Sequence, residues 1–224
     1  MSLLKSMVNT TIKGMTRVLC RVEANALDSV PKHGPLLLVA NHINFLDAPV
    51  VYTRLLPRPV TGFVKAETWE NPAMGFLFNV WGGIPIKRGE VDISALNQAL
   101  EALNAGKIVA VAPEGTRSGD GRLKRGYPGI TTLALHSHAP ILPLAYYGGE
   151  QFRDNLIHLR RTDFHIAVGK PFAIELGQEK VARHVRQAIT DEIMYQIAAL
   201  LPSAYRGEYA NLEAATQKYL RFLT

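Results

Sequence analysis

The chain has 224 residues, 47% of them apolar, which allows one large α/β domain or two small ones with a substantial core. Lysine and arginine number 25 against 19 acidic residues, and this excess favours an anionic partner such as a phosphate, a nucleic acid or an acidic lipid. No run alternates aromatic with basic residues, which argues against nucleic acid. The single cysteine, Cys20, excludes an internal disulfide and any multi-cysteine metal site.

Residues 1–24 are predicted to form one amphipathic helix. Apolar residues recur along it at steps of three and four, with lysines and arginines off the stripe: Leu4, Val8, Ile12, Met15, Leu19 and Val22. A basic amphipathic helix suits a membrane surface that contains anionic lipids. A terminal helix that packs its stripe on the domain has the same periodicity, so both interpretations stay open.

The rest of the chain, residues 25–224, alternates predicted strands with predicted helices. Strands are expected at 36–40, 60–64, 84–87, 107–112, 141–147 and 164–168. Helices are expected at 68–80, at 93–103, after the glycine-rich loop as far as about residue 136, and from about 179 to 201. A helical tail is expected beyond that. Asp92 and Asp47 are expected to cap helices that follow them. This alternation, without a linker or repeat, predicts a single α/β domain with a mixed, largely parallel sheet flanked by helices.

Polar segments follow three of these strands, beginning after Ala40, Ile86 and Ala112. In such sheets, functional loops gather at the carboxyl ends of the strands. We therefore expect the three segments to share one site.

The first segment holds His42 and Asp47. Residues five apart do not share a helix face, but a strand-to-helix turn can fold Asp47 back toward His42. A carboxylate bonded to Nδ1–H would leave Nε2 to accept a proton, which is the arrangement of a general base and its orienting partner. Alone, the pair is weak evidence, because a polar histidine and a helix-capping aspartate also occur by chance.

The other two segments carry basic residues and a carboxylate. Lys87 and Arg88 leave a strand beside Gly89, which suits a phosphate, although for this segment alone a solvated charge pair is the better explanation. Residues 112–118 combine a carboxylate, a hydroxyl and an arginine. The alternative there is an ordinary polar loop with Glu114 paired to an arginine.

Together the three segments resemble, in order and spacing, the motif blocks of the glycerolipid acyltransferase family with the His-x4-Asp motif, typified by lysophosphatidic acid (1-acyl-sn-glycerol-3-phosphate) acyltransferase. The matching stretches are Asn41–Asp47, Ile86–Arg88, Pro113–Ser118 and, for a fourth block around a proline, Ala139–Pro143. The resemblance covers roughly residues 35 to 150. Ala112 departs from the family, which commonly carries phenylalanine there.

The resemblance implies an O-acyltransferase domain over residues 25–224, with His42 as the general base and Asp47 orienting it. It also implies which residues bind the phosphate and glycerol of the acceptor: Arg88, Glu114, Gly115, Thr116 and Arg117. The acyl group would pass from acyl-CoA or acyl carrier protein to a lysophosphatidate-type hydroxyl, giving phosphatidate in phospholipid synthesis, without a metal or cofactor. The absence of a Gly-x-Ser-x-Gly elbow agrees with direct transfer in a ternary complex.

Three further expectations complete this interpretation. Backbone N–H groups near the His42 turn are candidates to stabilise the oxyanion. With no secretory signal and no apolar run long enough to span a bilayer, we expect a peripheral or monotopic protein on the cytoplasmic face of a membrane. The alternatives are an acyltransferase for another lipid acceptor (lysophospholipid, glycolipid or amino lipid) and a non-catalytic lipid-binding protein on the same scaffold.

Overall fold

The apolar run at residues 36–40 forms β2 (Leu36–Ala40), the centre of the sheet, in which every residue is buried. The computed structural model describes residues 3–87, 92–177 and 180–223, and within them nine strands form one sheet. β2 pairs in parallel with β5 (Ile108–Val111) on one side and with β6 (Ile141–Tyr147) on the other. Strands that are covered on both faces consist of continuous apolar residues, which is why these strands could be predicted from the sequence.

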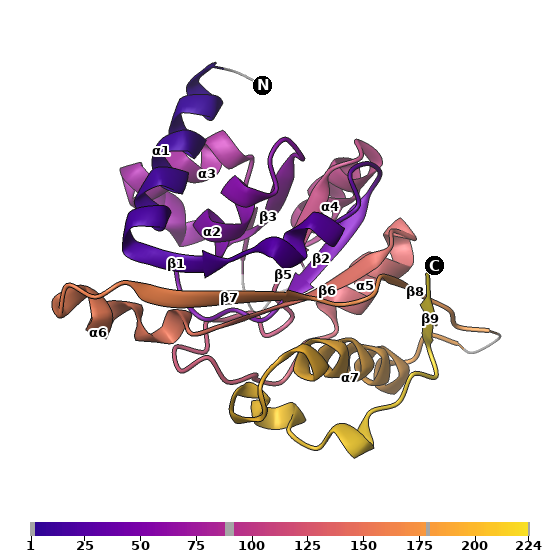
Figure 1. Cartoon of the computed structure of the whole chain (residues 1–224). Coiled ribbons are helices and arrows are strands. Elements are labelled where there is room, and N and C mark those ends of the chain that lie inside the picture. The colour runs from indigo at the N-terminus through magenta and orange to yellow at the C-terminus, as the bar shows by residue number, and fades with distance from the viewer. Residues whose placement is uncertain (1–2, 88–91, 178–179, 224) are drawn as a thin grey trace.

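The sheet has the order β1-β7-β6-β2-β5-β3-β4 (Figure 1). The remaining strands are β1 (Cys20–Glu23), β3 (Val60–Lys65), β4 (Ile84–Ile86), β7 (Thr162–Val168), β8 (Phe172–Ile174) and β9 (Leu220–Phe222). Pairing is parallel from β6 across to β4 and between β1 and β7, and antiparallel at β6–β7, β6–β8 and β8–β9. The predicted mixed, largely parallel sheet is confirmed.

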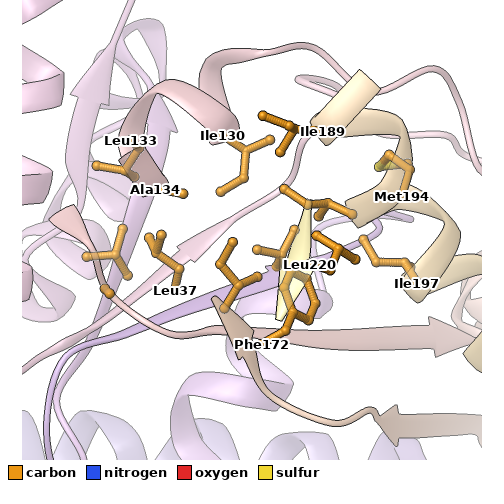
Figure 2. Close-up of a cluster of buried hydrophobic side chains, with 14 of the residues drawn as sticks. Leu37, Ile130, Leu133, Ala134, Phe172, Ile189, Met194, Ile197 and Leu220 are labelled. Atoms are coloured by element: carbon orange, nitrogen blue, oxygen red, sulfur yellow. The ribbon is translucent and has the colours of Figure 1, made fainter. Parts of the chain in front are cut away.

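Helices cover both faces of this sheet because successive side chains of β2 point to opposite sides. Leu37 and Val39 belong to one core, and Leu36 and Leu38 belong to the other. The first core lies under α4 (Ile93–Asn104), α5 (Gly129–Ser137) and α7 (Arg183–Leu200). The second lies under α1 (Leu3–Leu19), α2 (Asp47–Arg54), α3 (Pro72–Trp81) and α6 (Phe152–Ile157). Figure 2 shows side chains of α5 and α7 converging on Leu37 in the first core.

The structure confirms one predicted helix start and corrects another. Asp92 caps α4 as expected, since its Oδ1 accepts the N–H of Ala95 at 2.9 Å. The helix predicted over 68–80 instead begins at Pro72, after a 3₁₀ turn at Ala66–Glu70. The proline restricts Asn71 to an extended backbone, and the Asn71 side chain then caps α3.

The N-terminal helix is shorter than predicted. α1 ends at Leu19, and residues 20–23 form β1, whose Cys20 pairs with Thr162 of β7. The expected helix to residue 24 is therefore wrong in its last turn. A local period cannot reveal a strand whose partner lies far along the chain, and Val22 happened to continue the apolar stripe.

Polar side chains dock α1 on the domain. Asn9 is buried and its Oδ1 accepts the indole N–H of Trp81 at 2.8 Å, while the Thr16 hydroxyl accepts from Arg54 at 3.1 Å. The opposite side of the helix is apolar and exposed: Leu3, Leu4, Met7, Met15 and Val18. The predicted stripe is thus divided, with Ile12, Leu19 and Val22 half-buried against the core and Leu4 and Met15 exposed.

The C-terminal region also departs from the prediction. In place of a helical tail, residues 203–214 form three short 3₁₀ turns, and residues 220–222 form β9. α6 was not predicted, because its six residues are too short for a periodic pattern. Among the described helices, none is long and apolar enough to cross a membrane.

Candidate active site

The turn after β2 brings His42 and Asp47 together, as predicted. His42 Nδ1 lies 2.6 Å from Asp47 Oδ2, and since an ionised carboxylate only accepts hydrogen bonds, Nδ1 carries the proton. The same oxygen accepts the N–H groups of Ile43 at 2.7 Å and Asn44 at 3.1 Å. Asp47 is the first residue of α2, but its side chain turns back to the preceding turn and makes no capping bond to that helix. The expected helix cap is wrong, and the orienting role is what the geometry supports.

This contact fixes the tautomer of His42. With the proton held on Nδ1, Nε2 is the nitrogen left to accept a proton, and a quarter of the His42 side chain is exposed. The Asp47 carboxylate is buried, and its Oδ1 has no hydrogen-bond partner among the described residues. Three donors on Oδ2 therefore stabilise the buried charge.

Glu114 ties the first segment to the third. Its Oε1 accepts the N–H of His42 at 2.9 Å and its Oε2 accepts the N–H of Lys124 at 3.0 Å. Glu114 is buried, and burial raises the pKa of its carboxyl to about 7 even though both N–H bonds act against that shift. The alternative pairing with an arginine is not what the structure shows. Contact of Glu114 with the acceptor stays a prediction.

The backbones of the two segments are also joined directly. The N–H of Ser118 donates to the carbonyl of His42 at 2.8 Å, and the N–H of Gly119 donates to that of Ile43 at 3.2 Å. Because the two distant segments share three hydrogen bonds here, His42 is held by the loop after β5 as well as by its own turn.

The N–H groups of the His42 turn are already occupied. Those of His42, Ile43 and Asn44 all donate to the carboxylates of Glu114 and Asp47. The expectation that backbone donors of this turn stabilise the oxyanion is therefore wrong for these three groups. Such donors have to come from another part of the site.

The predicted acceptor-binding residues at the third segment are solvent-exposed. Gly115, Thr116 and Arg117 follow the buried Glu114, and Gly115 has a φ of 64°, a left-handed conformation that favours glycine. Lys87 is exposed at the end of β4, and Arg88 lies outside the described residues. Since β2, β5, β3 and β4 are parallel, the described parts of all three segments lie along one edge of the sheet, and the segments after β2 and β5 are joined there by hydrogen bonds.

Two asparagines of the first segment have roles that we did not predict. The Asn41 amide donates to the carbonyl of Tyr146 at 2.9 Å and accepts its N–H at 2.8 Å, so a side chain extends the β2–β6 ladder by one step. Asn44 Nδ2 donates to the carbonyl of Gly149 at 2.6 Å. Both anchor the turn to the chain after β6. The only sequence signal was the placement of Asn41 in the first motif block.

The C-terminal region supports the third segment. The Tyr209 hydroxyl accepts the N–H of Gly126 at 3.0 Å and donates to Asp191 at 3.0 Å, while Gln187 donates to the carbonyl of Gly126 at 3.2 Å. The N–H of Leu123 donates to the carbonyl of Tyr205 at 2.9 Å. Sequence reasoning missed these residues because no motif marks contacts between such distant parts of a chain.

The sequence is similar to those of known acyltransferases. The family model described as Acyltransferase matches residues 21–147. A chloroplastic 1-acyl-sn-glycerol-3-phosphate acyltransferase of Brassica napus is 30% identical over 57% of this chain and 38% of its own length. A lyso-ornithine lipid O-acyltransferase of Pseudomonas aeruginosa is 28% identical over 69% of this chain and 66% of its own length. This chain thus spans well under half of the plant relative.

The fold matches a solved structure as well. The crystal structure of a 1-acyl-sn-glycerophosphate acyltransferase from Thermotoga maritima superimposes with a TM-score of 0.61 at 20% identity, covering 88% of this chain and 79% of that one. At this identity the likeness concerns the fold alone. The family model, in contrast, covers more than half of the chain and spans both the His42 turn and the Glu114 loop. The chain belongs to the acyltransferase family.

Proposed function

We propose that the protein transfers a fatty acyl group from acyl-CoA or acyl carrier protein to the hydroxyl of a lysophosphatidate-type acceptor, giving phosphatidate. The observation that carries the proposal is the 2.6 Å contact between His42 Nδ1 and a buried Asp47, which makes Nε2 a general base. A non-catalytic lipid-binding protein would have no use for an oriented base.

The reaction needs one proton transfer in each direction. His42 Nε2 takes the proton of the acceptor hydroxyl as the oxygen attacks the thioester carbonyl, and the imidazolium then protonates the departing thiolate. A positioned base supplies about 10² to 10⁴ in rate, so orientation of the substrates and stabilisation of the oxyanion supply the remainder. The imidazolium formed on the way is stabilised by the Asp47 carboxylate.

A phosphate on the acceptor is favoured by the charge at this edge of the sheet. Arg117 is exposed in the loop that is bonded to the His42 turn, and Lys87 is exposed at the end of β4 on the same edge, with β5 and β3 between β4 and β2. Arginine binds phosphate bidentately, and a lysine adds a second charge. By family resemblance, Arg88 joins them. The names of several relatives specify 1-acyl-sn-glycerol-3-phosphate, which supports the same acceptor class.

A second candidate acceptor is an amino lipid. It is favoured by the similarity to the lyso-ornithine lipid O-acyltransferase, which extends over 69% of this chain. The chemistry at His42 would be the same, and the basic residues would then contact a different headgroup.

The test is mass spectrometry of the products from a mixed panel of acceptors with acyl-CoA and acyl carrier protein donors. We expect phosphatidate, together with thiol release that requires the acceptor. Product from a lyso-ornithine lipid alone would select the second candidate. Thiol release without an acceptor, or no turnover with any pair, would contradict acyl transfer.

Because the proposed substrates are lipids, we propose that the protein works at a membrane surface and that residues 1–24 are its anchor on the cytoplasmic face. The outward side of α1 is apolar, while its inward side is held by Asn9 and Thr16, so the exposed face is free to enter a lipid interface. Met7→Ser with Val18→Ser should lower sedimentation with anionic liposomes at an unchanged melting temperature. Undiminished sedimentation would contradict the anchor.

A further inference from the structure

The corner between α6 and β7 carries three exposed aliphatic side chains that the fold does not use. Leu156 is 45% exposed, Ile157 is 78% exposed and Leu159 is 94% exposed. Leu159 also has a φ of 54°, in the left-handed region that bulky residues rarely adopt. A strained backbone that presents a leucine to solvent gains nothing from packing within this chain.

Basic residues lie directly behind these aliphatic side chains. A cavity of about 830 Å³ opens beside the corner and is lined by Leu159, Arg160, Arg161 and Arg21, with Asp163 as the acidic member. The guanidinium of Arg160 makes no hydrogen bond or ion pair with any other described residue, since the one bond of this residue is from its backbone N–H to the carbonyl of Asn155. Arg21 has only an exposed contact of 3.4 Å with Asp163, an interaction worth little in water. Two guanidinium groups are therefore available to an anion.

The corner adjoins the C-terminal end of α1. Arg161 donates to the carbonyls of Arg17 at 2.6 Å and Cys20 at 2.7 Å, so it fastens the C-terminal end of α1 to the start of β7. That end of α1 carries the exposed Met15 and Val18. Figure 1 shows α6 and the lower end of α1 on the same side of the molecule.

We infer that the α6–β7 corner is a second membrane contact, in which the three aliphatic side chains enter the lipid interface and a phosphate of an anionic lipid binds at Arg21 and Arg160. An exposed apolar tip backed by cations matches the layered chemistry of such a surface, with anionic headgroups outside and acyl chains beneath. Two contacts joined by Arg161 would fix the orientation of the protein on the bilayer. The inference rests on the proposed membrane setting and is independent of the acceptor.

Fluorescence at the corner gives a direct test. Leu159→Cys is labelled with an environment-sensitive fluorophore in the full chain, and Ile93→Cys on α4, where the native side chain is 65% exposed, is the matched control. Cys20 is buried and burial raises the pKa of its thiol, so brief labelling leaves it unmodified. Vesicles of phosphatidylcholine with phosphatidylglycerol should blue-shift the label at 159 and leave that at 93 unchanged. No shift at 159, or equal shifts at both sites, would overturn the inference.

Vesicle binding separates the apolar and the charged parts. Leu159→Asn suits the left-handed backbone, so the fold is retained, and Arg160→Gln removes one charge. Each should weaken binding to anionic vesicles about fivefold, and only Arg160→Gln should reduce the salt dependence. Ile93→Asn and Arg183→Gln, on other helices, are the controls and should bind as the parent does.

Activity distinguishes a lipid contact from other roles. Both corner variants should retain the parent rate with short, soluble substrates in the absence of vesicles, whether or not phosphatidate is the natural product. If vesicle binding is unchanged but transfer from acyl carrier protein falls, the corner is a protein-docking surface and the inference is wrong.

Discussion

The turns that follow β2 and β5 lie at the same edge of the sheet, yet their side chains are in opposite states. In the first turn, Asp47 is buried and its Oδ2 accepts three hydrogen bonds around His42. In the second, Gly115 to Arg117 are exposed, and the Arg117 side chain makes no hydrogen bond to another described residue. Glu114 marks the boundary between the two states, since it is buried and bonded to both segments.

The difference indicates that the two turns have different roles. The proton-transfer geometry exists before substrate arrives, which is what a positioned base requires. The exposed arginine of the second turn, in contrast, would gain a partner only on binding of the phosphate that we propose for the acceptor. Substitutions in the first turn should therefore alter turnover for every substrate, and substitutions in the second should depend on the headgroup.

The largest effect is expected at the base. His42→Ala should lower kcat by at least about 10² to 10⁴ for all acceptors, with little change in melting temperature, since the ring is partly exposed. Asp47→Asn should also be severe, because an amide can hold the wrong tautomer of His42. Steady-state kinetics of purified variants measure both. Near-parental transfer by His42→Ala would refute the mechanism.

Arg117 should show the selective behaviour of the second turn. Losing a charged hydrogen bond costs about 1.5–3 kcal/mol, so Arg117→Ala should lower kcat/KM roughly ten- to 150-fold for a phosphorylated acceptor. The penalty should shrink for an acceptor without phosphate. Arg122→Ala, an exposed arginine of the same loop, is the control. Equal penalties for both acceptor types would indicate a structural role. The same selectivity is expected for Arg88→Ala.

Glu114 should make stability depend on pH. Its pKa rises from 4.5 to about 7 on folding, so the folded state holds the proton more tightly, and stability is lost as pH rises from about 4.5 to about 7. The change is on the order of 3 kcal/mol. Glu114→Gln should flatten this part of the profile. Melting curves at pH 5, 6, 7 and 8 on both proteins provide the comparison, and parallel profiles would contradict the assignment.

The smallest effect is expected at Tyr209, which supports the second turn from behind. Tyr209→Phe leaves the N–H of Gly126 without its acceptor and should destabilise the fold by about 1–2 kcal/mol. Thermal unfolding would show this as a fall of a few degrees. A lower kcat at unchanged KM would show that the loop also positions the base. Phe behaving as Tyr in both measurements would contradict the supporting role.

The elements that sequence predicted best are those whose signal is local. The bounds of β2 and β6 were predicted correctly because each is an apolar run long enough for a buried strand. The start of α4 was predicted from Asp92, whose capping bond reaches only three residues along the chain. The His42–Asp47 contact was predicted for the same reason, since both residues belong to one turn.

What sequence did not predict depends on contacts between distant residues. β1 exists because Cys20 meets Thr162, and Glu114 is buried because it bonds to a backbone 72 residues away. No property of Glu114 itself distinguishes an acceptor ligand from a brace inside the site. The roles of the exposed residues Gly115 to Arg117 remain predictions from resemblance.

The way α1 is docked has a calorimetric consequence. Directional bonds from Trp81 to Asn9, from Arg54 to Thr16 and from Arg161 to the carbonyl of Arg17 hold the helix, whereas few of its apolar side chains, among them Ile12 and Leu19, pack on the core. The heat capacity of a transition follows the apolar area that becomes hydrated. Detachment of α1 should therefore be nearly silent in a scanning calorimeter, and hydrogen exchange at residues 9 and 16 should detect it at temperatures where the melting curve is still flat.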